Sequence, residues 1–408
     1  MTKMTARMTR SRRLAAAITL LAASTVLHLA PGGPAAADPA AAFADAPIGA
    51  AAAAGVTGGS GGEVRAVSNL ESNGAGSLRE AAEKPGPAIV VFAVSGRIAL
   101  REPISVASNL TIDGRGADVT VVGKGLLVDG ASNIVIRNLR MRGSPASDSN
   151  DDAIAVSGGA KGVWIDHMDL AGFKDGLIDV TQGATGVTLS WNKLAEHGKT
   201  MLLGSNVQEG TPELVDITVH HNLYLGTGER NPMVRQARVH VFNNVLQSWG
   251  YAADSGYGMR SDCGGIVLVQ ANIFRPASNP RAVTVRQQNC DPTRLPALRL
   301  QDNDLGGAEV EQARPTTVTN VDRAPVVPEP VGPALLDKVQ TGAGWQMVAN
   351  PTPIPDPPTD MPKLPGDPPG PAPSPGAGFP IAPLVAGAAL VFGVGLGIVM
   401  GTRRRRRL

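Results

Sequence analysis

The chain has 408 residues, which is enough for one large domain or two ordinary domains. Its formal net charge is +2, and five of the positive charges belong to the terminal run 403–407, so nucleic acid is not expected as a partner. The 49 Gly, the 33 Pro and an aromatic content of 3% argue against a helical bundle and favour β structure rich in turns.

The N-terminal region has the layout of an export signal. Residues 1–37 contain a basic start, an apolar stretch over 14–30 and small residues at 35–37, which together predict a secretory signal peptide. The Ala- and Gly-rich residues 38–62 that follow are predicted to form a flexible segment.

A short helix is predicted at the start of the main domain. In "GAGSLREAAEKPG", Ser77 and Glu80 have the spacing of a capping box, and the helix must stop before Pro85. We expect this N-terminal capping helix to cover the open end of the domain that follows.

Seven short segments between residues 133 and 305 resemble one another and recur in steps of 22 to 31 residues. In each, aliphatic residues alternate with polar ones before a turn. The step is too long for a hairpin strand and has no helical pattern, so the sequence predicts an all-β, right-handed parallel β-helix over residues 63–350. Aligning the segments places one column of residues together: Leu139, Met168, Asn192, Asn222, Asn244, Asn272 and Asn303.

The recurring Asn of this column has a structural explanation. Asn adopts the left-handed turn conformation more readily than most residues, and its side chain can hydrogen-bond the Asn of the next coil. We therefore expect these residues to stabilise the stack rather than to act in catalysis.

Four charged residues are not needed by the repeat. Asp152, Asp175, Lys199 and Arg230 follow one another at steps of 23, 24 and 31 residues, and the last step contains a polar loop. We expect them on four successive coils of one outer face. A solvated turn explains any one carboxylate equally well, but like charges on adjacent coils favour a bound counter-ion.

The residue types in this column suggest a metal and a ligand. Oxygens of Asp and Asn suit a hard cation, and calcium accepts about six to eight of them in irregular geometry. The cations Lys199 and Arg230 beside such a site would suit an extended polyanion. Arg235 is five positions from Arg230, and we expect Pro232 to bend the chain so that both arginines reach one groove.

The two cysteines, Cys263 and Cys290, both belong to the part predicted to be exported. A single disulfide and two buried thiols are both compatible with the sequence.

The C-terminal region loses the repeat. Residues 310–350 are expected to wrap back over the solenoid, and residues 351–379 form a Pro-rich linker. Residues 380–402 are predicted to be a transmembrane helix, and the Arg tail 403–408 would stay cytoplasmic. The expected location is therefore extracellular, at the cell surface, anchored in the plasma membrane.

Several segments together resemble the pectate lyases of polysaccharide lyase family one, over about residues 63–305. They are "GVWIDHMDL", "DGLIDVTQGATGVTLSWN", "HGKTMLLGS", "ITVHHNLYLGTGERNPMVRQARVHVFNN" and "GYGMRSDCGGIVLVQANIF". The resemblance implies calcium (Ca2+) as cofactor. It implies Asp152, Asp175 and Asp179 as metal ligands, with Asn150 standing where some members carry a further Asp.

The resemblance also implies roles for the cations and a reaction. Lys199 and Arg235 would bind substrate, and Arg230 would be the catalytic base. The reaction is β-elimination on polygalacturonate, in which a proton leaves C5 of a uronate and the glycosidic oxygen leaves C4, giving 4,5-unsaturated oligogalacturonides. Neighbouring cations would favour the neutral form of Arg230, so an alkaline optimum is implied. A monomer acting on an acidic polysaccharide is expected.

Three other functions remain compatible with the sequence. A pectin lyase would need no calcium, and its cleft tends to be rich in aromatic residues, whereas this chain has four Trp. A polygalacturonase-type hydrolase would need facing carboxylates for acid and base work. A non-catalytic solenoid could bind acidic polysaccharide at the cell surface.

Overall fold

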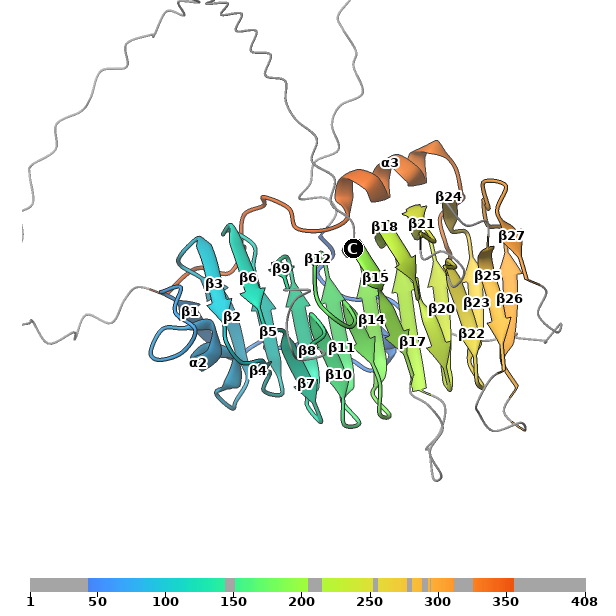
Figure 1. The fold of residues 1–408 in the computed structure, drawn as a ribbon. Coiled ribbons are helices and arrows are strands. Elements are labelled where there is room, and N and C mark those ends of the chain that lie inside the picture. Colours follow the sequence, from blue (N-terminus) through green and yellow to red (C-terminus); the bar gives the residue numbers. More distant parts are fainter. Residues whose placement is uncertain are drawn as a thin grey trace, which may run out of the picture. The chain divides into compact units, whose positions relative to one another are not determined.

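The structure is a computed structural model of the 408-residue chain. It describes residues 43–143, 151–204, 215–251, 256–276, 281–287, 293, 295–311 and 326–355. The described residues form a right-handed parallel β-solenoid, as the repeat predicts, in which the central coils each give one strand to each of three sheets (Figure 1).

Sheet A has ten parallel strands in sequence order along the stack. They are β1 (Glu63–Val67), β2 (Ala88–Phe92), β5 (Leu110–Asp113), β8 (Ser132–Arg137), β11 (Lys161–Asp166), β14 (Thr185–Ser190), β17 (Val215–His220), β20 (Ala237–Phe242), β23 (Ile266–Gln270) and β26 (Ala297–Gln301).

Sheet B has eight strands, each of which follows a strand of sheet A in the chain. They are β3 (Gly96–Leu100), β6 (Val119–Gly123), β9 (Arg140–Arg142), β12 (Asp169–Ala171), β15 (Lys193–Lys199), β18 (Leu223–Glu229), β21 (Val245–Trp249) and β24 (Ile273–Pro276).

Sheet C has nine strands and completes each coil. They are β4 (Ile104–Ser105), β7 (Leu126–Asp129), β10 (Ile154–Ser157), β13 (Ile178–Val180), β16 (Met201–Leu203), β19 (Met233–Arg235), β22 (Met259–Asp262), β25 (Arg281–Arg286) and β27 (Glu309–Val310).

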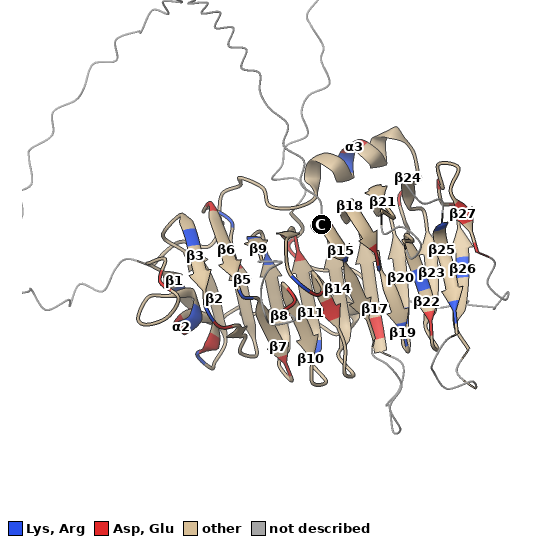
Figure 2. Cartoon of the chain, viewed as in Figure 1, with Lys and Arg blue, Asp and Glu red and all other residues tan. Residues whose placement is uncertain are grey.

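The core is a set of aliphatic columns inside the coils. In sheet A, Ile165, Leu189 and Val219 are aligned on three neighbouring strands, and all three are fully buried. Each such side chain contributes about 1.5–3 kcal/mol through burial. Most of the ribbon carries no charge, and the charged positions are scattered along it (Figure 2).

The predicted Asn ladder is present. Asn192, Asn222, Asn244 and Asn272 lie at the turn from sheet A to sheet B. Each donates hydrogen bonds of 2.9–3.0 Å from its backbone N–H and from its Nδ2 to the Oδ1 of the next Asn. Asn303 is the last rung. The ladder satisfies buried amides that no water reaches.

The left-handed conformation is not at the Asn, which corrects the prediction. The residue one position earlier has positive φ in every coil of the column: Asn138, His167, Trp191, His221, Asn243, Ala271 and Asp302, with φ between 51° and 57°. The role of the Asn in this column is therefore its side-chain hydrogen bonds and not a left-handed backbone conformation.

Residues 43–62 are ordered, although the composition of 38–62 predicts flexibility. The helix α1 (Ala50–Ala53) and the chain after it run across the outside of sheet A and form what we call the N-terminal strap, residues 43–62 (Figure 1). The backbone N–H groups of Ala50 and Ala51 donate to the hydroxyls of Thr218 and Thr188 at 2.9 and 3.0 Å.

Glycine allows the strap to approach the sheet this closely. A Cβ on Gly59 would lie 1.7 Å from the carbonyl oxygen of Ala88, so only Gly fits there. The small residues that suggest flexibility in the sequence are those that permit backbone-to-sheet contact.

The capping helix is present as α2 (Leu78–Glu83). The hydroxyl of Ser77 accepts a hydrogen bond from Glu80 N–H, and the Glu80 carboxylate accepts one from Gly76 N–H at 2.6 Å. The helix buries Leu78 against the first coils, which covers the open end of the stack.

Residues 326–355 wrap back over the solenoid and are called the C-terminal strap. Its helix α3 (Pro333–Gly342) buries Leu335 and Val339 against a cluster that includes Trp191. After the helix, Gln346 exchanges hydrogen bonds with Asn138, six coils before the end of the ladder.

The remaining predicted segments, the signal peptide 1–37, most of the linker 351–379, the transmembrane helix 380–402 and the tail 403–408, lie outside the described residues. Among the helices that the structure describes, none combines the length and apolar character that crossing a bilayer requires.

Removing a central rung of the ladder should destabilise the fold. Asn222→Ala removes the side-chain donor to the carbonyl oxygens of Leu189 and His220 and the acceptor of the Asn192 backbone N–H, so we expect a loss of about 3 kcal/mol in the free energy of unfolding. Urea unfolding followed by circular dichroism measures it. Asn303→Ala, at the half-exposed last rung, should cost about 1 kcal/mol, and equal losses would contradict the argument.

Candidate active site

The charged column lies where the chain passes from sheet B to sheet C. Asp152 precedes β10, Asp175 precedes β13, Lys199 ends β15 and Arg230 follows β18. Backbone bonds join these turns: Asp175 N–H donates to Asp151 O at 3.3 Å, Leu177 N–H to Thr200 O at 2.9 Å, and Met201 N–H to Arg230 O at 2.9 Å. The four residues therefore lie on four successive coils, within a residue or so of one column.

Two carboxylates converge beside Gly176. The Oδ1 of Asp152 accepts the Gly176 N–H at 2.6 Å, and the Oδ1 of Asp179 accepts the Leu202 N–H at 3.0 Å. A Cβ on Gly176 would lie 2.9 Å from the first oxygen and 2.5 Å from the second. The glycine is thus required by the approach of the two acids, which we call the acidic pair.

Burial and mutual repulsion raise the pKa values of the two carboxyl groups of the acidic pair. Burial, with a smaller contribution from the charges of Asp175 and Asp151, raises the pKa of Asp152 to about 6, against the lowering effects of the Gly176 N–H and Arg230. Burial also raises the pKa of Asp179 to about 8, with Asp152 as the next cause. An acid with that pKa is protonated at neutral pH unless a cation lies beside it.

Asp175 is directed toward a cation of the protein. Its Oδ1 is 3.5 Å from the Nζ of Lys199, and both side chains are partly exposed. Its carbonyl oxygen accepts a hydrogen bond from Nε2 of His197 at 2.5 Å. Burial lowers the pKa of His197, so the imidazole is neutral and holds the backbone of Asp175 in place.

Arg230 faces the acidic pair. Its charge opposes the raised pKa of both Asp152 and Asp179. The residue has φ of 60°, and the next residue, Asn231, is fixed by the Thr200 hydroxyl at 2.6 Å. An arginine in the left-handed region needs such support, because the conformation costs energy for a residue with a Cβ.

Arg235 is on the same turn-and-strand segment, at the end of β19. Its Nη2 and Nε lie 3.1 and 3.2 Å from Oδ2 of the buried Asp262, one coil further on. A cis peptide joins Asn231 to Pro232, where the sequence predicts a bend. The structure thus brings Arg230 to the acidic pair and holds Arg235 against Asp262.

Sequence reasoning missed three residues of this region. Lys124 forms an ion pair with Asp151 at 2.5 Å, His197 supports Asp175, and Asp262 orients Arg235. Lys124 and Asp262 each lie 27 residues from their partners, about one coil, so the repeat length could have indicated both. Asn150 lies outside the described residues. Cys263 is disulfide-bonded, and the one other cysteine, Cys290, also lies outside them.

The donor atoms suit a hard cation. Within the part of the chain that the structure describes, no three His, Cys, Asp or Glu side chains already converge as a metal site. The acidic pair nevertheless offers two carboxylates at one point, with pKa values raised by burial and by the neighbouring carboxylates. This set of oxygens fits calcium, which binds carboxylates and carbonyls.

A parallel β-solenoid with carboxylates, a lysine and an arginine on one outer column defines a class of polysaccharide-active protein. A sequence model described as pectate lyase matches residues 14–293, and the chain belongs to this family. It is a polysaccharide lyase of the pectate lyase type, as the resemblance implies.

Individual relatives are also pectate lyases, in agreement with the family match. The chain is 32% identical to pectate lyase 1 of Hesperocyparis arizonica, over 58% of this chain and 70% of that protein. It is 33% identical to pectate lyase plyB of Emericella nidulans, over 62% of this chain and 74% of that protein.

The solved structure of Jun a 1, the major allergen of cedar pollen, is similar with a TM-score of 0.62 and 27% identity. The likeness covers 74% of this chain and 94% of that one. A pectate lyase of Bacillus subtilis has the same fold at 20% identity, with a TM-score of 0.61 and coverage of 74% and 97%.

Filling the space at Gly176 should separate the acidic pair. Gly176→Ala places a methyl group against both carboxylate oxygens, so we expect lyase activity to fall at least about tenfold with the fold retained. Activity and thermal unfolding are measured together. Gly198→Ala is the matched control, because its nearest neighbour would be 3.8 Å away. Wild-type activity in Gly176→Ala would show that the pair is not used.

Proposed function

We propose that this pectate lyase cleaves polygalacturonate by calcium-dependent β-elimination and releases 4,5-unsaturated oligogalacturonides. The observation that carries the proposal is the acidic pair beside Arg230, with Lys199 on the coil between. A related pectate lyase from Bacillus sp. N165 was solved in complex with trigalacturonate, which supports an acidic polysaccharide as the substrate class.

Each residue of the column has a role in the proposal. Asp152 and Asp179, with Asp175 and Asn150, would hold calcium, which when bound supplies positive charge to the uronate carboxylate. Lys199 and Arg235 bind the anionic substrate, and the Asp262 carboxylate orients the guanidinium of Arg235. Preformed cations stabilise the negative charge that develops after the C5 proton is removed.

Arg230 is the proposed base. A guanidinium is normally protonated, and the carboxylates that face it stabilise that charge. A general base acts in its deprotonated form, so activity is expected to rise toward alkaline pH.

The rival functions differ in what they require. A pectin lyase would leave the acidic pair without a purpose. A polygalacturonase would use the pair as acid and base, yet Lys199 and Arg230 would have no part in hydrolysis, and the family match is to lyases. A non-catalytic solenoid would need the cations but not the raised pKa values.

One assay separates these functions. The full chain is mixed with polygalacturonate and calcium, and ultraviolet absorbance reports the unsaturated product. We expect the absorbance to rise and a chelator to abolish the rise. Reducing ends without absorbance would indicate a hydrolase, an unchanged rate in chelator a pectin lyase, and binding without cleavage an adhesin.

The base is tested in the same assay. Arg230→Lys keeps the charge but loses the guanidinium, so we expect a fall of at least about 100-fold. Arg238→Lys is the matched control, since Arg238 pairs with Asp216 on sheet A at 2.7 Å. Full activity in Arg230→Lys would exclude Arg230 as the base.

We also propose that the enzyme is exported and anchored. The support is the sequence alone: the signal layout of residues 1–37, the uncharged segment 380–402 and the Arg tail 403–408. We expect the full chain in the membrane fraction and accessible to added protease on intact cells. A chain ended after residue 379 should appear in the medium, and retention in the cytosol would refute the proposal.

A further inference from the structure

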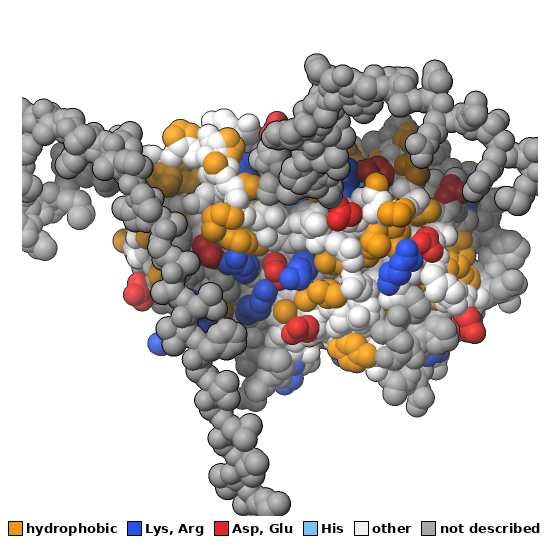
Figure 3. All heavy atoms as spheres, turned by 90° about the horizontal axis from the view of Figure 1, so that it is seen from above, with side chains coloured by type: hydrophobic (Ala, Val, Ile, Leu, Met, Phe, Trp, Pro, Cys, Tyr) orange, Lys and Arg blue, Asp and Glu red, His pale blue; other side chains and the backbone are white. Residues whose placement is uncertain are grey.

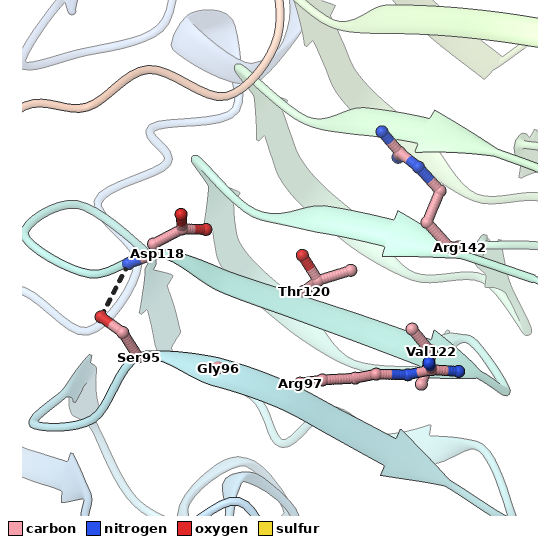
Figure 4. Close-up of a pocket in the computed structure, with 7 residues that line it drawn as sticks. All are labelled: Ser95, Gly96, Arg97, Asp118, Thr120, Val122 and Arg142. Carbon is pink, nitrogen blue, oxygen red and sulfur yellow. Dashed lines mark hydrogen bonds between the residues drawn. The ribbon is translucent and has the colours of Figure 1, made fainter. Parts of the chain in front are cut away.

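A polar hollow lies away from the candidate active site. It is on the outer face of the first strands of sheet B, has a volume of about 670 Å³ and is open to solvent (Figure 4). Its lining comes from β3, β6 and β9 and the turns before them: Ser95, Gly96, Arg97, Asp118, Thr120, Val122 and Arg142. The acidic pair, by contrast, lies at the edge of sheet C.

Arg97 is the principal cation of the hollow. Its side chain is exposed, and it makes neither a hydrogen bond nor an ion pair with any residue in the described ranges. Figure 4 shows its guanidinium extended along the hollow below Arg142. A long charged side chain with no protein partner on a concave surface is available to a ligand.

Arg142 is held at the other side of the hollow. Its Nη2 is 2.7 Å from Oδ1 of Asp169 and its Nη1 is 2.6 Å from the Asp169 carbonyl oxygen, while its side chain remains 37% exposed. Arg97 and Arg142 stand on strands two apart in the sheet, so their backbones are separated by roughly 10 Å. That separation suits an extended anion better than a single small one.

The acid in the hollow is already neutralised. Asp118 is ion-paired with Arg140, whose guanidinium also stacks 3.5 Å above the ring of Trp345 from the C-terminal strap. Arg142 is likewise paired with Asp169, so the positive excess of the hollow comes from Arg97. Seen from above, Lys and Arg side chains stand beside Asp and Glu side chains over the earlier coils of this face (Figure 3).

We infer that this hollow binds carboxylates of an acidic polysaccharide at a site separate from the cleavage site. The hydroxyl of Thr120 lies between the two cations, and that of Ser95 lies at the far end of the hollow, where it accepts a hydrogen bond from Asp118 N–H at 3.0 Å. Both hydroxyls suit sugar hydroxyls, and Val122 is the one apolar side chain in the lining. The choice of polysaccharide rests on the proposed function. Such a site would keep the polymer on the enzyme between cleavage events.

Charge reversal at Arg97 tests the inference. Binding of polygalacturonate to the full chain is measured at low salt in a chelator, which removes calcium from the cleavage site. Arg97→Glu should weaken this binding about tenfold, and it should leave the turnover of trigalacturonate with calcium unchanged. Lys161→Glu is the matched control, because Lys161 is exposed on sheet A and outside the hollow.

The outcomes are distinct. Unchanged polymer binding in Arg97→Glu, or an equal loss in Lys161→Glu, overturns the site. Competition by inorganic phosphate as strong as that by trigalacturonate overturns its assignment to a polysaccharide. The wild-type protein could bind the polymer without cleaving it, and Arg97→Glu could lose that binding. This result would uphold the site in the hollow while the proposed function fails.

Discussion

The coils cannot slide past one another, and the candidate site depends on this constraint. Each Asn of the ladder gives its amide to the coil on one side and its oxygen to the coil on the other. A slip of one residue would leave buried amides without partners along the whole stack, at a cost of about 1–3 kcal/mol for each. Residues one coil apart in sequence are therefore fixed as neighbours in space.

Because the register between coils is fixed, the spacing of residues in the sequence determines which of them lie side by side in the site. Asp152, Asp175, Lys199 and Arg230 are separated by long stretches of chain, yet each occupies the same turn of its own coil. The two straps restrict which parts of the outer surface of the solenoid are accessible. The N-terminal strap covers part of the outside of sheet A, and α3 covers an apolar cluster that includes Trp191. Neither is hydrogen-bonded to the turns that carry the acidic pair, within the described chain.

The periodic features were predictable from the sequence, and the non-periodic ones were not. The Asn column and the charged column follow from spacing, because a solenoid repeats its geometry at each coil. The capping helix is not periodic, and it was predictable from the local signal of Ser77 and Glu80. The order of residues 43–62 did not follow, since small residues suggest flexibility unless the surface they pack against is known. Gly59 illustrates this, because the need for glycine there comes from the nearby carbonyl oxygen of Ala88. The pairing of Arg235 with Asp262 needed the register of β19 and β22.

The N-terminal strap also has a consequence for the order of assembly. Ala50 and Ala51 are synthesised early, but their partners Thr218 and Thr188 follow 168 and 137 residues later in the chain. The later part of the strap can bind sooner, because Gly59 donates to Thr111 on the third strand of sheet A. The part around Ala50 and Ala51 has neither of its hydroxyl partners until the sixth and seventh strands have formed, so the residues made first are among the last to be fastened.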